Sequence, residues 1–186
     1  MVSREEALKI VRELIKNENL VRHHLAAEVC MKALAVKLKG NEEEWGLVGL
    51  LHDADYELTK DPLKHTLVLD EELKKRGIDL DPEILNAVKF HNKDNVECHE
   101  SLMGWTIYIC DELTGLIVAC ALIQPDKKLN SIDTNFVIRR FNEPNFARGA
   151  DRKRILPCEE KLGIPLEEFI TICLTAMQNA HVDLGL

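Results

Sequence analysis

The chain carries four side chains of the types that bind divalent metal ions, at three separate places: His23, the adjacent pair His52-Asp53, and Asp111. Imidazole and carboxylate groups without a thiolate suit Mn, Fe, Co, Ni, Zn or Mg, and they do not choose among these metals. A metal ion held in this way can lower the pKa of a bound water to about 7 and polarise a phosphoryl oxygen. If the four side chains converge in the fold, they have the donor types of a site for a divalent cation.

The pair His52-Asp53 ends an apolar helical run, residues 45–51. The apolar positions of this run recur with helical spacing and lead to His52, so its imidazole is predicted to point inward with them. Asp53 follows Gly46 and Gly49 at i−7 and i−4, where a neighbouring helix can approach closely. A buried imidazole and carboxylate need a partner, because a buried charge is costly unless it is paired or bound to a metal.

The other two candidates lie on other predicted helices. His23 belongs to an otherwise apolar stripe and is predicted to face the interior, whereas His24 lies on a charged stripe and is predicted to face water. Asp111 and Glu112 are the only charges within the apolar segment 102–118. A carboxylate in that position needs compensation. For Asp111, a salt bridge to an arginine elsewhere and a metal ion are both open interpretations.

Nearly every other segment also has helical periodicity and capping signals. The expected helices cover residues 3–15, 19–40, 41–53, 61–77, a segment from 81, 100–123, 133–141, 149–162 and 165–180. No strand is predicted, because no run of four or more residues alternates cleanly between apolar and polar. One all-α domain spanning residues 1–186 is the prediction, with 126–150 as its least regular part and a possible appended subregion.

Composition narrows the class of protein. The net charge is −8, with acidic and basic residues interspersed, which argues against a nucleic-acid surface. Residues 1–6 do not resemble a signal peptide, and the longest apolar stretch, 113–123, falls short of the roughly 20 residues that span a bilayer. The six cysteines form no C-x-x-C pair, which favours reduced, mostly buried thiols in a cytoplasmic protein. The oligomeric state is not indicated.

The order His23, His52-Asp53, Asp111 resembles the H…HD…D signature of the HD superfamily of metal-dependent phosphohydrolases. Longer segments resemble an HDIG-type subgroup, over about residues 1–180: 19–23, 45–56, 90–92 and 111–117. The resemblance implies a helical bundle of the HD-domain type that holds one divalent cation on these four side chains. It also implies attack of metal-bound water on a small phosphorylated molecule, such as a nucleotide or related phosphoester, with His52 and Asp53 as the catalytic residues.

Two further histidines fit the same order. His91 ends an apolar stripe that begins at Ile84, and His65 lies just after Pro62, the expected first residue of a helix. Some HD proteins hold a second metal ion with histidines from such positions. The alternative is that both bind substrate or water beside a single ion. We favour the single ion, because the sequence offers no extra inward carboxylate that clearly bridges two.

Substrate contacts are less well defined by the sequence. Lys93 is the candidate for binding substrate phosphate, and five other basic residues are weaker ones, each more typical of a solvated surface: Lys60, Lys127, Lys128, Arg148 and Arg152. Segment 146–152 resembles a segment toward the C-terminus of the HDIG-type subgroup, and the sequence indicates no mechanistic role for it.

The loop 54–61 contains Asp55, Glu57 and Asp61, in an order that does not match HD nucleotidases or guanosine-tetraphosphate hydrolases. This departure is compatible with an alternative function, a non-catalytic HD-fold module that keeps its metal and senses a nucleotide. A third interpretation is a purely structural bundle in which the inward histidines and aspartates pair with one another.

Overall fold

The computed structural model describes residues 2–186, so that Met1, part of the N-terminal segment considered above, lies outside it. Within the described residues there are helices and loops and no strand, and the predicted all-α bundle is confirmed. The helices in chain order are α1 (Arg4–Leu14), α2 (Glu18–Leu38), α3 (Glu42–Leu51), α4 (Leu67–Lys75), α5 (Pro82–Phe90), α6 (Leu102–Leu122), the 3₁₀ turn η1 (Leu129–Ser131), α7 (Thr134–Phe141), α8 (Arg152–Ile155), α9 (Cys158–Leu162), α10 (Leu166–Asn179) and α11 (His181–Leu184).

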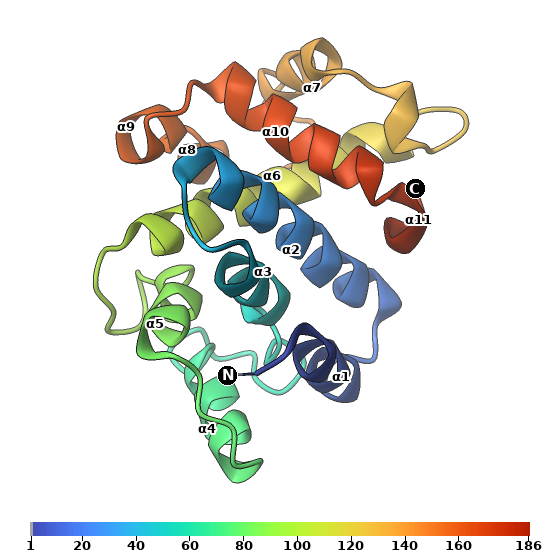
Figure 1. Ribbon diagram of the computed structural model, residues 1–186. Helices are drawn as coiled ribbons and strands as arrows, with labels where there is room; N and C mark the ends of the chain where they lie inside the picture. The colour runs from blue at the N-terminus through green and yellow to red at the C-terminus, as the bar shows by residue number, and fades with distance from the viewer. Residues whose placement is uncertain (1) are drawn as a thin grey trace.

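The two longest helices, α2 and α6, form the centre of the bundle (Figure 1). Helix α2 packs against α3, α6 and α10, and α6 also packs against α5, α7, α8 and α9. Their apolar side chains join one hydrophobic core. Side chains carried by α2, α3 and α6 therefore project from elements that are held on several sides.

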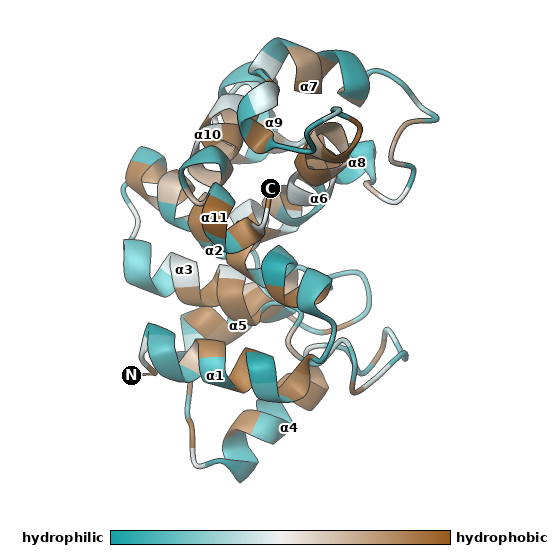
Figure 2. Cartoon of the chain, turned by 90° about the vertical axis from the view of Figure 1, so that its right-hand side faces the viewer, coloured by the Kyte–Doolittle hydropathy of each residue, from teal (hydrophilic) through white to brown (hydrophobic). Residues whose placement is uncertain are grey.

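Helix α3 is buried on all sides after a hydrophilic first turn, a change that Figure 2 shows along its length. Residues 45–51 are all buried. A Cβ atom at Gly49 would lie 2.6 Å from the carbonyl oxygen of Ala27 and 2.7 Å from the backbone nitrogen of Glu28. Helices α3 and α2 thus touch backbone to backbone. The close approach predicted from Gly49 is confirmed, and it brings the end of α3 beside His23.

The helix predicted from Asp61 begins later, at Leu67. Thr66 interrupts the helical backbone with a φ of 73°. The buried carboxylate of Asp55 accepts hydrogen bonds from the backbone N–H groups of Thr66, at 2.7 Å, and Leu69, at 3.0 Å. The first N–H groups of a helix need such acceptors. Asp55 therefore caps α4 from outside the helix, while the carboxylate of Asp61 accepts from the N–H of Leu63 in the preceding turn.

The C-terminal third also differs in detail from the prediction. The helix expected over 149–162 is divided into α8 and α9 at Pro157, whose ring is incompatible with a helix interior. Residues 126–150 contain η1, α7 and all but the last residue of the loop 142–151, in keeping with their irregular sequence. The single-domain boundary of 1–186 stays a prediction.

By length and composition alone, α6 is apolar enough to cross a membrane. The stretch 113–123 considered above covers only the part of α6 that follows Glu112. Most of α6 is buried inside the protein, among α2, α5, α8 and α9. The core helix of a soluble protein has the same composition, and burial of this extent explains the apolar sequence without a membrane.

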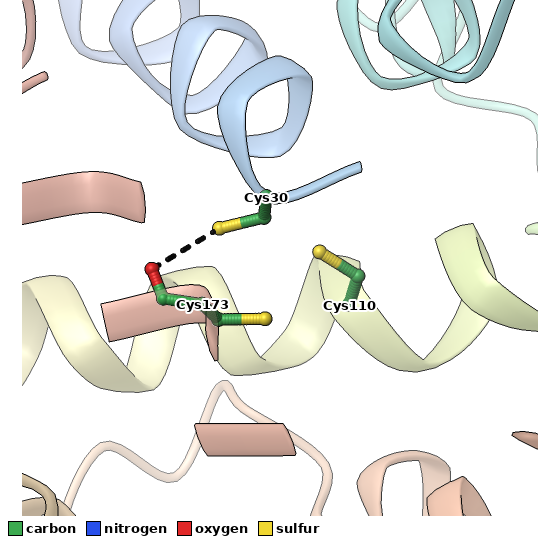
Figure 3. Close-up of side chains that lie close together, drawn as sticks. All are labelled: Cys30, Cys110 and Cys173. Atoms are coloured by element: carbon green, nitrogen blue, oxygen red, sulfur yellow. Dashed lines mark hydrogen bonds between the residues drawn. The ribbon is translucent and has the colours of Figure 1, made fainter. Parts of the chain in front are cut away.

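All six cysteines are free, and all but Cys98 are buried. Cys30 of α2, Cys110 of α6 and Cys173 of α10 meet where these helices pack together, with their sulfur atoms within 4.8 Å of one another (Figure 3). The Cys30 thiol donates a hydrogen bond to the Cys173 carbonyl at 3.6 Å. Small thiols fill this junction as apolar side chains do, in agreement with the predicted burial.

Replacement of Gly49 by alanine tests the contact between α2 and α3. The added methyl group would collide with backbone, so the helices must move apart. Overpacking of this kind costs about 1–3 kcal/mol of unfolding free energy. Urea denaturation of Gly49→Ala is expected to show a loss of this size.

The matched control is Gly115→Ala, also within a helix, where a Cβ meets no described atom within 4 Å. This control is expected to gain about 0.5–1 kcal/mol, because alanine is the better helix former. An unchanged stability in Gly49→Ala would contradict the direct backbone contact.

Candidate metal centre

His23 from α2, Asp111 from α6 and the pair His52-Asp53 at the end of α3 converge on one point. The His23 Nε2 atom lies 3.0 Å from Asp111 Oδ1 and 3.2 Å from His52 Nε2. The Asp53 Oδ2 atom lies 4.0 Å from His23 Nε2 and 3.9 Å from His52 Nε2. Around an octahedral ion with bonds of about 2.1 Å, adjacent ligand atoms are about 3 Å apart and opposite ones about 4 Å. The donor types and their spacing therefore fit a divalent cation.

A second group adjoins the first through Asp53. The Asp53 Oδ1 atom lies 3.0 Å from His65 Nε2 and 3.0 Å from His91 Nε2, and these two nitrogens are 2.9 Å apart. One oxygen of Asp53 thus faces the two histidines of the first group, and the other faces His65 and His91. A carboxylate with this placement can bridge two ions. The reason given above for a single ion, the lack of a bridging carboxylate, therefore does not hold.

The outer nitrogens of the imidazoles are held by the backbone of their own helical turns. His52 Nδ1 lies 2.8 Å from the carbonyl oxygen of Gly49, and His91 Nδ1 lies 2.7 Å from that of Val88. A carbonyl can only accept, so Nδ1 carries the proton in both rings. The Nε2 lone pair of each ring then points toward the carboxylates, as a metal ligand requires.

His65 and His23 are oriented by side chains instead. His65 Nδ1 lies 2.6 Å from Asp55 Oδ1, and His23 Nδ1 lies 3.3 Å from the hydroxyl of Thr114. That hydroxyl donates its own proton to the Asp111 carbonyl at 2.7 Å, which leaves it as an acceptor for His23. All four rings therefore have one nitrogen engaged and the other directed at the cluster.

Asp55 is the functional residue that sequence analysis did not single out. It is fully buried, and its two oxygens join His65 to the start of α4. A carboxylate behind a ligating histidine fixes the tautomer and orientation of the ring. The available signal was its position two residues after Asp53, but the loop was compared only with the patterns of other HD enzymes.

The two aspartates of the cluster are ionised. Burial favours the neutral acid, but the adjacent His52, His65 and His91 hold the pKa of Asp53 well below its usual range. Burial likewise opposes ionisation of Asp111, but the adjacent His23 and His52 lower its pKa well below the usual range. Burial lowers the pKa of His23, yet Asp111 more than offsets this and raises it to about 9. The cluster thus attracts positive charge, which a metal ion can supply in place of protons.

An ion pair with an arginine does not compensate the charge of Asp111. Within residues 2–186, only His23 and His52 lie within ion-pair distance of its carboxylate. The neighbouring Glu112 takes the arginine instead, with Arg154 Nη1 at 3.0 Å. The salt-bridge interpretation of Asp111 is therefore contradicted.

His24 was predicted to face water and is instead buried, with 1% exposure. Its Nδ1–H donates to the carbonyl oxygen of Leu50 at 2.8 Å, and its ring centroid lies 5.3 Å from that of His52. Burial, together with the nearby His52 and His23, lowers the pKa of His24 to about 3, so the ring is neutral. The prediction was wrong because α2 is covered on several sides at this point, and Glu28 on the same stripe is buried too, paired to Arg4.

A cavity of 330 Å³ lies beside His23 and Asp111, and the loop 142–151 forms part of its wall. Arg152 holds this loop from behind. Its guanidinium donates to the carbonyl oxygens of Phe146 at 2.5 Å and of Ala147 and Ala150 at 2.7 Å. Segment 146–152 therefore shapes the cavity, and Arg152 is a loop anchor in this structure, not a free phosphate ligand.

The remaining basic candidates have other surroundings. Lys93 forms an ion pair with Asp94 at 2.9 Å and lies 4.7 Å from the ring centroid of Tyr108. Lys127, Lys128 and Arg148 are exposed. Lys60 lines a small cavity with His65.

Arg154, which the sequence did not single out, contacts the cluster indirectly, because its Nη2 donates to the carbonyl oxygen of His91 at 2.6 Å. His99 and His181, near helix ends, lie outside the cluster.

Comparison with known proteins agrees with the geometry. A model of the HD domain matches residues 20–116, just over half of the chain, and this span contains His23, His52, Asp53 and Asp111. Searches of curated proteins and of solved structures found no match. The match is to the HD domain as a whole, so the HDIG-type assignment stays a prediction. With its helical bundle and its histidine and aspartate cluster, this chain belongs to the HD domain family, whose members are generally metal-dependent hydrolases.

Proposed function

We propose that this chain is a metal-dependent phosphohydrolase acting on a small phosphorylated molecule, a nucleotide or a related phosphoester. The observation that carries the proposal is the convergence of His23, His52 and Asp53 with Asp111, whose Oδ1 lies 3.0 Å from His23 Nε2 and 3.5 Å from His52 Nε2. The outer nitrogen of each of these imidazoles is already engaged. Packing alone does not require four such groups to meet within a buried cluster. Membership of the HD domain family supports the same reaction class.

A divalent cation bound by these residues would act as a Lewis acid toward phosphoryl oxygens and lower the pKa of a bound water. The chain itself supplies the positioning. Asp53 has an oxygen directed to each histidine pair and is placed to orient the attacking water, and His52 is held rigidly behind it by Gly49. In the overall reaction, water adds to phosphorus, the ester P–O bond breaks, and the alcohol leaves with a proton as phosphate is released.

The placement of Asp53 supports two ions, one in each histidine group. His65 and His91 then act as ligands of the second ion, in agreement with their 3.0 Å distances to Asp53 Oδ1. Lys60 is a basic side chain near this second group, since it lines a cavity with His65.

The proposed substrate is small and soluble, with no nucleic-acid polymer or membrane as partner. A net charge of −8 supports this, since a polymer of phosphates would be repelled. The cytoplasm is the proposed location, which the free, buried cysteines support.

The alternative function, a non-catalytic sensor, rests on the loop 54–61, whose acidic residues do not match the patterns of other HD enzymes. In the structure, Asp55 of that loop positions His65 and caps α4, so the departure has a structural explanation. No feature of the described residues favours sensing over turnover.

Substitution of Asp53 by alanine is expected to remove both metal and activity. The carboxylate belongs to both groups of histidines, so its loss should lower kcat/KM by about 100-fold or more, above the range seen for residues behind the ligands. The measurements are metal content after purification without chelator, and phosphate release from a panel of phosphoesters with Mn²⁺ or Ni²⁺.

The control for this variant is Asp79→Ala, which removes one exposed carboxylate and should retain metal and turnover. Full activity in Asp53→Ala would refute the hydrolase proposal. A wild-type melting temperature that does not change on addition of Mn²⁺ or Ni²⁺ would favour the purely structural interpretation, because a ligand that binds only the folded state must stabilise it.

Asp55→Asn is expected to weaken the second group selectively. An asparagine keeps the shape but loses the charge that orients His65, and its amide N–H₂ opposes either that ring or the N–H groups of α4. Loss of such a partner typically reduces metal affinity by about 10–100-fold. Metal titration should show bound ions falling from two per chain toward one, while Asp79→Asn keeps both. An unchanged stoichiometry would contradict the role of Asp55.

A further inference from the structure

Two cavities adjoin at the metal centre. The first, of 330 Å³, is the one walled by loop 142–151, and the second, of 450 Å³, lies between α2, α6 and the C-terminal residues 184–186. His23 and Gly115 are the two residues that line both. The larger cavity is therefore bordered by a candidate metal ligand, His23, and by Gly115, which has no side chain.

The larger cavity has mostly apolar walls. Ala26, Val118, Leu122 and Leu184 form them, and Arg22 supplies the charged group at the rim. Arg22 donates only a long hydrogen bond, 3.4 Å, to Asn19, and no carboxylate within residues 2–186 lies at ion-pair distance from it. A space of this size and lining suits an organic group with apolar faces. A phosphate group alone would need neither the volume nor the apolar walls.

Gly115 has no evident role in the fold. It lies in the middle of α6, where glycine is less favourable than alanine. A Cβ at this position would meet no described atom within 4 Å, and the backbone does not have the positive φ that would require glycine. Close packing explains why residue 49 is a glycine, but it does not explain why residue 115 is one. The effect of Gly115 is to leave the space between the two cavities open.

We propose that the larger cavity binds the leaving group of the phosphoester, a bulky and mostly apolar alcohol, and that Gly115 is the residue that admits it. This rests on the proposed hydrolase function. The phosphoryl group lies at the His23 and Asp111 edge, and the alcohol portion extends over Gly115 along Ala26 and Val118. Its continuity with the metal centre through His23 is what distinguishes this cavity from an unrelated apolar groove.

The kinetic test measures kcat/KM for two substrates, 2-naphthyl phosphate and glycerol 2-phosphate, in each variant. The ratio of the two values is then compared between variants, so that the different intrinsic reactivities of the two esters cancel. Gly115→Leu places a side chain where the two cavities meet. The ratio of kcat/KM for the naphthyl ester to that for the glycerol ester is expected to fall by at least about 10-fold, since a pocket discriminates by this amount for a methylene-sized change. Gly115→Ala should give a smaller fall in the same direction.

Glu167→Leu is the control, because it adds the same side chain at an exposed position of α10 outside both cavities. Its substrate ratio should equal that of the wild type. If Gly115→Leu reduces both substrates equally, the leaving-group site is wrong while the hydrolase proposal stands.

A binding measurement separates the two proposals when no turnover is seen. Fluorescence titration with 2-naphthol, the alcohol alone, reports occupancy of the larger cavity without any reaction. Binding to the wild type and at least about 10-fold weaker binding to Gly115→Leu would support the cavity assignment even if no ester were hydrolysed. Equal affinity in both proteins, or no binding to either, would overturn it.

Discussion

The constraint on which the site depends is electrostatic: two ionised carboxylates, Asp53 and Asp111, share one largely buried cluster with four imidazoles. Neither carboxylate has a lysine or arginine partner among the described residues. Such charges are tolerated in a protein interior only beside compensating positive charge. Protonated histidine can supply it, as the raised pKa of His23 indicates, and a divalent cation supplies it with better geometry for both aspartates.

The fold meets this constraint by taking ligands from helices whose positions are fixed elsewhere. The backbone contact at Gly49 sets the separation of α2 and α3, and α6 is buried along most of its length. Rigid elements hold ligand atoms more accurately than loops do. His65 is the exception, since it lies in the turn before α4, and there Asp55 replaces the missing helical support.

Helical periodicity, together with the family signature, was enough to predict the all-α bundle and the residues that meet at the centre, because His23, His52 and Asp111 lie on regular helices. Helical periodicity failed for His24, because a stripe of charged residues indicates solvent exposure only where that side of the helix is not covered by other helices. It also failed for the start of α4, where the cap comes from Asp55 at a distance in sequence. The contacts of Arg154 with Glu112 and His91 depend on how α8 packs against α6, and no local pattern encodes that.

The anchoring of loop 142–151 has a consequence for the evolution of specificity. Arg152 contacts the loop through backbone carbonyls, which every amino acid possesses, and not through the side chains that face the cavity. Residues of this wall can therefore be exchanged without disturbing the anchor. A scaffold of this kind would let related HD-domain proteins diversify the molecules they accept while the histidine and aspartate cluster behind the wall stays the same.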